Sequence, residues 1–351
     1  MLVTPELYQM NLYLHIGTEK TGSSYLQSLL ALNRAELLKQ GIYYPRTAER
    51  WERRMESGEI SPGNSHLLSE ALRSQDFNEA RSLISQTYEE ANHKQASSVI
   101  LSNELLIFAI SEKRNFNSIH QLFIDCGFTN IKYCLYLREP VEQALSLYKH
   151  RAKNGKAPHI SEWIKEQHPL PDVLQNFRET LEKQNDLFTL FKYQNREGYF
   201  EKTFFHDFLD FREQLKLPEI QQVNPSLNLS ELTVIKQLNT IDSRLTRPVY
   251  DTLITIPKQD KADDSLLEQN YKAIIYDELK QYGSLWEALN EYIQHGKLNV
   301  NTGSIVEIRE EEVRLSSKQL QNILACMSLG MSIKRQIFQG IKNKVRKLVR
   351  K

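Results

Sequence analysis

The residues best suited to chemistry lie in the stretch 12–27, which reads LYLHIGTEKTGSSYLQ. The run from Leu12 to Ile16 has the composition of a buried strand, and it leads into a loop with Lys20, then hydroxyl residues and a helix-like sequence. At such a junction the first N–H groups of the helix point outward, and the positive end of the helix dipole faces the same way. The stretch therefore predicts a binding site for an anion such as a phosphate.

The spacing of this loop differs from that of a Walker A loop, which reads G-x-x-x-x-G-K-[ST] with the lysine after the second glycine. Here the lysine precedes the second glycine, and the residues expected to hold the anion are Gly17, Lys20, Thr21, Gly22, Ser23 and Ser24. The lysine can stabilise charge on a leaving oxygen, the hydroxyls can donate to phosphate oxygens, and the glycines allow close approach of the backbone.

A second segment offers groups for another phosphate. Arg138 follows the apolar run Ile131–Leu137, and Ser146 comes eight residues later in a predicted helix. A guanidinium presents a fixed fork of donors to phosphate oxygens, and a serine hydroxyl adds one more.

KTGSSY (20–25) and REPVEQALS (138–146) together resemble two motifs of the sulfotransferases that use 3′-phosphoadenosine 5′-phosphosulfate (PAPS). The first is similar to their 5′-phosphosulfate loop and the second to their 3′-phosphate segment. The resemblance implies that Lys20 is catalytic at the leaving oxygen, that 21–24 hold the phosphosulfate, that Tyr25 lies near adenine, and that Arg138 and Ser146 bind the 3′-phosphate.

Weaker similarity to bacterial carbohydrate sulfotransferases continues through 188–211 and 223–239, so the resemblance covers about 11–240. It implies transfer of a sulfuryl group to a hydroxyl of an exopolysaccharide, oligosaccharide or glycolipid. The Arg-Lys-Gly segment of the cytosolic small-molecule enzymes has only a poor counterpart at 196–198, which argues against that branch.

Two residues are candidates for the base that takes the proton of the acceptor hydroxyl. Glu104 follows a predicted strand at the same sheet edge as Lys20, and a carboxylate there can accept a proton. His66, in a loop rich in Gly, Pro and Ser, is the rival base or a substrate ligand, since imidazole titrates near neutral pH.

Three apolar runs are expected to position these residues as buried parallel strands: Leu12–Ile16, Ser98–Leu101 and Ile131–Leu137. Helical patterns separate them, which predicts an α/β fold with a P-loop-like, doubly wound parallel sheet flanked by helices. Ligands bind at the carboxyl ends of such strands, where Lys20, Glu104 and Arg138 would meet.

The rest of the chain is predicted to be mostly helical after residue 140, with a fourth strand at 188–193. Expected helices span 25–38, 78–92, 141–153, 172–190, 203–215 and 231–238, the last with Ser230 as N-cap. The domain boundaries expected are 10–295 for the α/β domain, 296–330 for an irregular or helical extension, and 331–351 for a basic tail helix.

The bulk properties narrow the class of protein. The chain has 351 residues, 40% of them hydrophobic, and a net charge of +1, so the charge predicts no nucleic-acid partner. The three cysteines lack the paired spacing of a disulfide framework or a metal site, so neither is predicted. No signal peptide or membrane-spanning run is seen, and a cytoplasmic protein is expected.

The tail 331–351 is basic, with apolar residues at helical spacing and no acidic residue. This pattern is typical of a helix that lies on a membrane surface, and equally of a helix packed on the domain with a basic outer face. A surface helix would place the enzyme at the inner face of the membrane, near a lipid-linked acceptor.

Two other functions compete with sulfuryl transfer. One is a nucleotide-dependent phosphotransferase related to P-loop kinases, against which stand the lysine position and the lack of an evident Mg²⁺-binding Asp after a strand. The other is a non-catalytic, membrane-associated scaffold with a vestigial nucleotide site. The sequence does not indicate the oligomeric state.

Overall fold

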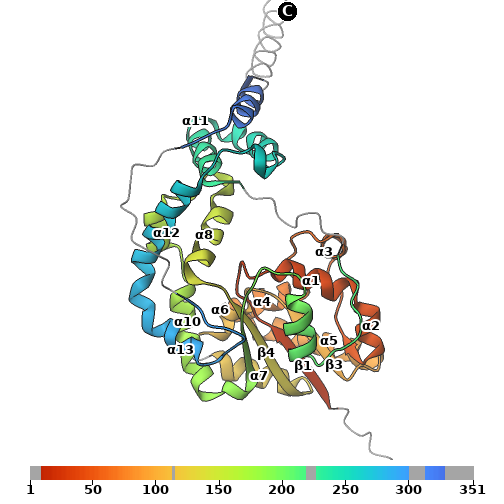
Figure 1. Ribbon diagram of the computed structural model, residues 1–351. Coiled ribbons are helices and arrows are strands. Elements are labelled where there is room, and N and C mark those ends of the chain that lie inside the picture. The colour runs from red at the N-terminus through yellow and green to blue at the C-terminus, as the bar shows by residue number, and fades with distance from the viewer. Residues whose placement is uncertain (1–8, 113–114, 219–226, 300–312, 329–351) are drawn as a thin grey trace, which may run out of the picture. The chain divides into compact units, whose positions relative to one another are not determined.

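The structure, a computed structural model, describes residues 9–112, 115–218, 227–299 and 313–328 (Figure 1). The chain folds into two compact units, and each is assembled from three segments. The first unit takes Met1–Gln143, His168–Asn224 and Leu279–Asn301; the second takes Ala144–Gln167, Pro225–Glu278 and Thr302–Lys351. The predicted domain 10–295 therefore contains parts of both units, and the predicted tail 331–351 lies outside the described residues.

A six-stranded, all-parallel sheet forms the centre of the first unit, in the order β2-β3-β1-β4-β5-β6. The strands are β1 Met10–His15, β2 Ile42–Tyr43, β3 Ser98–Ser102, β4 Phe128–Leu137, β5 Phe188–Lys192 and β6 Ile293–Gln294. The four predicted strands are confirmed, with small changes of bounds. The two-residue strands β2 and β6 are too short to show a pattern of their own.

Alternation along the strands places apolar residues on both faces of the sheet. In β1, Leu12 and Leu14 enter one core, while Ile100 of β3 and Tyr136 of β4 enter the other. The first core is covered by α4 His66–Arg73, α5 Phe77–His93, α6 Leu106–Ile110, α7 Asn115–Asp125, α10 Leu170–Lys183 and α13 Gly283–Asn290. The second is covered by α1 Ser23–Leu32, α2 Arg34–Lys39, α3 Glu49–Glu56 and the π-helix η3 Glu201–Phe208. The α/β class and the helix-flanked parallel sheet are thus confirmed.

Several predicted helices have different bounds. The helix expected over 25–38 is broken at Asn33, because its buried side-chain amide donates to the carbonyls of Leu29 (2.8 Å) and Lys216 (2.9 Å). The helix expected over 172–190 ends at Lys183, since the chain turns through η2 Asn185–Leu187 into β5. The helix expected over 203–215 is η3, which ends at Phe208.

The second unit is helical in the part that the structure describes. It contains the end of α8 Pro140–Arg151, then η1 Ala152–Asn154, α9 Ile160–Glu166, α11 Leu229–Leu253, η4 Lys258–Asp260, most of α12 Ser265–Leu279, and a helix over 317–328. The prediction of Ser230 as N-cap is wrong. Asn228 caps α11 through a capping box with Glu231, and Ser230 donates its hydroxyl to Asp264 instead.

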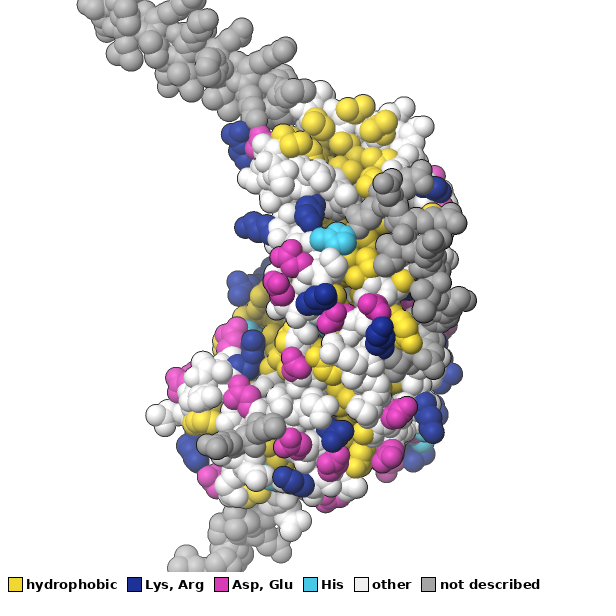
Figure 2. All heavy atoms as spheres, turned by 90° about the vertical axis from the view of Figure 1, so that its left-hand side faces the viewer, with side chains coloured by type: hydrophobic (Ala, Val, Ile, Leu, Met, Phe, Trp, Pro, Cys, Tyr) yellow, Lys and Arg dark blue, Asp and Glu magenta, His cyan; other side chains and the backbone are white. Residues whose placement is uncertain are grey.

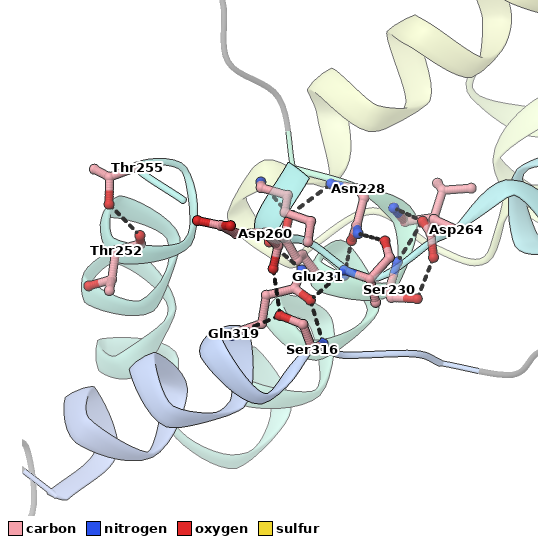
Figure 3. Close-up of polar contacts among 12 residues, drawn as sticks. Asn228, Ser230, Glu231, Thr252, Thr255, Asp260, Asp264, Ser316 and Gln319 are labelled. Atoms are coloured by element: carbon pink, nitrogen blue, oxygen red, sulfur yellow. Dashed lines mark hydrogen bonds and ion pairs between the residues drawn. The ribbon is translucent and has the colours of Figure 1, made fainter. Parts of the chain in front are cut away.

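A buried polar network joins the start of α11 to the helix over 317–328 (Figure 3). Glu231 is fully buried and accepts from Lys261 Nζ (2.8 Å) and Gln319 Nε2 (2.7 Å). Gln319 Oε1 in turn accepts from the backbone N–H groups of Ala262 (3.0 Å) and Ser316 (2.7 Å). The network holds together three segments that are far apart in the sequence.

None of the helices in the described part of the chain combines the length and apolar character needed to cross a lipid bilayer.

Candidate functional site

The loop after β1 is fixed by backbone hydrogen bonds to β4 on one side and to α6, which follows β3, on the other. Thr18 N donates to Tyr136 O of β4 (3.0 Å), and Tyr136 N donates to Gly17 O (2.8 Å). On the side of β3, Ile107 N donates to Ile16 O (3.0 Å). The loop therefore leaves the sheet between the ends of β3 and β4, which brings the three predicted strand ends to one edge.

Side chains hold the loop from within. Thr21 is fully buried, and its hydroxyl donates to Thr18 O (2.5 Å). Gln143 of α8, also buried, donates from Nε2 to Thr18 Oγ1 (2.7 Å) and to Glu19 O (2.8 Å). The Thr21 hydroxyl thus donates its hydrogen to the loop itself, and this hydrogen is not available to an anion.

Position 17 must be a glycine because the backbone of Glu104 comes very close to it. Gly17 has a φ of 123°, and a Cβ there would lie 2.5 Å from Glu104 O, closer than real Cβ atoms come to any atom. The segment after β3 is therefore packed directly on the loop, which brings Glu104 to the start of the loop.

The N-terminus of α1 has the features of an anion site. Gly22 stands at the N-cap and no side chain caps the helix, so its first N–H groups have no side-chain acceptor. Ser23 Oγ is buried and has no hydrogen-bond partner, and Ser24 beside it is half-buried. Lys20 adopts the left-handed conformation with a φ of 64°, an uncommon one for a lysine. An orphaned hydroxyl beside uncapped N–H groups is what a bound oxyanion would satisfy.

Arg138 reaches the same loop from the end of β4. Its Nη1 donates to Lys20 O (3.4 Å), and its Nη2 lies 3.9 Å from Glu142 Oε2. The guanidinium carbon lies 6.0 Å from the ring centroid of Tyr193, and 28% of the side chain is exposed. Arg138 is thus oriented towards the loop while part of its fork of donors faces solvent.

Aromatic rings border the loop at Gly22. A Cβ at Gly22 would lie 2.9 Å from the rings of both Tyr193 and Phe200. The ring of Tyr25 lies 6.0 Å from that of Phe200, and its hydroxyl donates to Glu201 Oε1 (3.0 Å). Burial first, and then this bond to Glu201, raise the pKa of Tyr25, so it is a neutral phenol. Phe200 is buried, whereas Tyr25 and Tyr193 are half-buried, so the exposed apolar surface beside the loop comes from these two tyrosines.

The two candidate bases differ in what the structure shows of them. Glu104 is half-buried at the edge where the loop emerges. His66 begins α4, with Nδ1 3.5 Å from Thr47 Oγ1. No hydrogen bond between described residues joins His66 to the loop. Glu104 is therefore the candidate whose backbone is packed against the loop.

Ser146 is half-buried on α8. It belongs to the second unit, whereas Arg138 belongs to the first. Its role at a 3′-phosphate stays a prediction from the resemblance.

Three residues of the site were not singled out from the sequence. Gln143 lies inside the REPVEQALS segment, where a glutamine on an amphipathic helix has no pattern that marks it as buried. Tyr193 and Phe200 lie in the weaker stretch of similarity, and their place over Gly22 depends on the sheet order. Burial of a lone polar residue is set by tertiary structure, which periodicity does not encode.

Among the described residues, no group of three or more His, Cys, Asp or Glu side chains is arranged to hold a metal ion. No model of a known protein family matches the chain, and no curated protein matches it significantly.

Proposed function

We propose that this protein is a sulfotransferase that moves a sulfuryl group from PAPS to a hydroxyl of a carbohydrate. The observation that carries the proposal is the meeting of the loop after β1 and Arg138 after β4, with Arg138 Nη1 3.4 Å from Lys20 O. PAPS carries two separate anionic groups, a 5′-phosphosulfate and a 3′-phosphate. The N-terminus of α1 offers a place for the first, and the partly exposed guanidinium offers donors for the second.

The proposed step is an in-line displacement. The acceptor oxygen bonds to sulfur while the bond from sulfur to the 5′-phosphate oxygen breaks, and the electron pair leaves with 3′-phosphoadenosine 5′-phosphate (PAP). Lys20 stabilises the charge that develops on the leaving oxygen, an effect worth about 10²–10³ in rate for one donor. Glu104, or His66 as its rival, takes the proton of the hydroxyl.

Acceptor and location are part of the same proposal. A carbohydrate acceptor rests on the resemblance alone, and contact with the cytoplasmic membrane face rests on the basic tail 331–351. Figure 2 shows hydrophobic side chains gathered at the surface of the end of the second unit that carries α11, and the large apolar residues exposed in that unit include Ile241, Leu320 and Leu324. Liposome co-sedimentation of the full chain and of a truncation after residue 330 tests the contact; equal binding of both contradicts a role of the tail.

Thermal unfolding with three nucleotides tests the site. We expect PAP at a hundredfold excess over its Kd to add about 2.7 kcal/mol of stability. Adenosine 5′-phosphate should add less, because it lacks the 3′-phosphate. A response to ATP with Mg²⁺ and none to PAP would favour the phosphotransferase and reject the sulfotransferase.

Three variants assign the roles. Arg138→Ala should remove the preference for PAP over adenosine 5′-phosphate, while Arg53→Ala, an exposed arginine of α3, should keep it. Lys20→Ala should retain much of the PAP binding and lose transfer of radiolabelled sulfate from PAPS. PAP binding with no transfer to any glycan, in the wild type and in Lys20→Ala alike, would favour the non-catalytic scaffold.

A further inference from the structure

The helix over 317–328 packs on the rest of the second unit through one of its sides. Gln319 is fully buried in the polar network of Figure 3, and Ile323 is buried one turn later. Cys326 Sγ, in the following turn, lies 3.1 Å from Thr252 Oγ1 of α11. Positions 319, 323 and 326 follow helical spacing, so they define the inner side of this helix.

An apolar stripe of Leu320, Leu324 and Met327 runs along another side of the same helix. Leu320 is 48% exposed and Leu324 is 56% exposed, although both are large aliphatic side chains, and Met327 is half-buried. Residues three and four positions apart lie next to one another on a helix, so the three side chains are neighbours. Scattered exposed apolar residues are ordinary, but neighbouring ones on one side of a helix indicate an interaction surface.

The sequence continues the apolar stripe beyond the described residues and adds positive charge to it. Apolar residues follow at 331, 338, 341, 345 and 348, with the same spacing of three, four or seven. The stretch 317–351 contains no aspartate or glutamate. Its basic residues after 333 are Lys334, Arg335, Lys342, Lys344, Arg346, Lys347, Arg350 and Lys351. The partner that fits such a stretch is apolar where it meets the stripe and negatively charged beside it.

We propose that the apolar stripe inserts into the surface of a bilayer that contains anionic phospholipids. The stripe lies at the boundary between acyl chains and headgroups, and the basic residues after 333 pair with the lipid phosphates. The inference rests on the membrane contact proposed above and deepens it, because it assigns part of that contact to described residues of the second unit. It does not depend on sulfuryl transfer.

A second copy of the chain is the competing occupant, because the same spacing suits a two-stranded coiled coil. Two features favour the bilayer. Lys334 falls on the spacing of the stripe, where a coiled-coil seam would bury it, whereas at a bilayer its long side chain can extend to the headgroups. The tail 331–351 has eight basic residues and no acidic one, so two identical tails repel each other, while an anionic surface attracts both.

Co-sedimentation of the full chain with vesicles tests the proposal. We expect binding to phosphatidylglycerol vesicles, and binding to phosphatidylcholine vesicles that is at least about tenfold weaker for lack of the anionic headgroups. The double variant Leu320→Ser/Leu324→Ser should bind phosphatidylglycerol about tenfold more weakly, because two aliphatic side chains no longer leave water. Leu67→Ser, at a leucine of α4 that is 53% exposed in the first unit, should bind as the wild type does.

The outcomes separate this inference from the proposals above. Wild-type affinity in the double serine variant contradicts the inference and leaves the contact of the tail standing. Absence of wild-type binding to phosphatidylglycerol overturns both. Stabilisation by PAP, measured on the same samples, reports on the sulfotransferase site independently. A wild type that sediments as a dimer in the ultracentrifuge, with a monomeric serine variant and equal vesicle binding, assigns the stripe to a second copy and overturns the proposal.

A tryptophan at the stripe measures insertion directly and does not depend on the serine variant folding. The fluorescence of Leu324→Trp, after subtraction of the wild-type signal, should shift to the blue with phosphatidylglycerol vesicles and be quenched by brominated lipid. Leu67→Trp, the matched control, should show neither effect. Equal quenching at the two positions, or none at position 324 in a protein that binds the vesicles, contradicts insertion of the stripe.

Discussion

Gln143 Nε2 lies 2.7 Å from Thr18 Oγ1, so a side chain of α8 holds the loop that follows β1. The same nitrogen donates to Glu19 O (2.8 Å), and Thr18 in turn receives the hydroxyl of Thr21. An internal chain of hydrogen bonds therefore holds the loop in its conformation. Such preorganisation lowers the entropic cost of binding an anion.

Replacing Gln143 should disorder this loop. Gln143→Leu keeps the volume but leaves Thr18 Oγ1 and Glu19 O without their buried donor, at a cost of about 1–3 kcal/mol. We expect weaker PAP binding in a protein that still folds, measured by urea unfolding and PAP titration. Gln121→Leu removes an exposed glutamine of α7 that bonds to Asp125 and should change neither quantity. PAP affinity equal to that of the wild type in Gln143→Leu would show that the bond has no role in positioning the loop.

Gly17→Ala should be among the most destabilising substitutions in the first unit. The added Cβ meets a backbone oxygen that cannot move alone, which predicts a loss above about 3 kcal/mol. Gly198 is the matched control, because it also has a positive φ, of 71°, but no atom lies within 4 Å of its Cβ position. Gly198→Ala should cost about 1–2 kcal/mol. Equal losses in chemical denaturation would mean that the contact with Glu104 O is relaxed without cost.

Stability should fall as the solution becomes acidic, in part because of His15. The side chain is fully buried in β1, and burial lowers its pKa to about 3 from the usual 6.5. Between these pH values the unfolded chain binds a proton at His15 that the folded chain does not. The contribution of His15 to the free energy of unfolding is therefore complete above pH 6.5 and decreases as the pH falls towards 3. A difference of one bound proton between the unfolded and folded chains changes the free energy of unfolding by about 1.4 kcal/mol per pH unit.

His15→Gln should reduce the slope between pH 6.5 and 4. It should not abolish the slope, because burial also lowers the pKa of His168, to about 4. His93→Gln, at an exposed position at the end of α5, should leave it unchanged. Urea unfolding at stepped pH measures the three slopes, and a His15→Gln slope identical to that of the wild type would assign the acid sensitivity to other groups.

The ion pair between Glu231 and Lys261 should stabilise the packing of the helix over 317–328 against the start of α11. Glu231→Gln leaves Lys261, whose side chain is only 9% exposed, without its opposite charge, at a cost of about 3–5 kcal/mol. Faster amide hydrogen exchange in that helix is the expected result, because Gln319 bonds to the same carboxylate. Arg247→Met removes an ion pair with Asp251 at an arginine that is 80% exposed, and exchange should stay as in the wild type.

The sequence was informative where local pattern and general topology suffice. Apolar runs revealed four strands, and the shared edge of parallel strands predicted that Lys20, Glu104 and Arg138 would be brought together. The hydrogen bond from Gln143 to Thr18 was not predictable, because the two residues are 125 positions apart in the sequence. Likewise Asn33 breaks a good helical pattern only because Lys216 from a distant segment meets its amide.

The division of the chain into interleaved segments has a consequence for synthesis on the ribosome. The polypeptide leaves the first unit after Gln143 and again after Asn224, and each time returns to it; the edge strand β6 follows the second return. A nascent chain that has reached Glu278 therefore holds all of its other strands but not β6, and it lacks the last segment of each unit. Until then the edge of β5 is exposed to pairing with other chains. The sheet of the first unit is therefore completed only after residues 225–278 of the second unit have been synthesised.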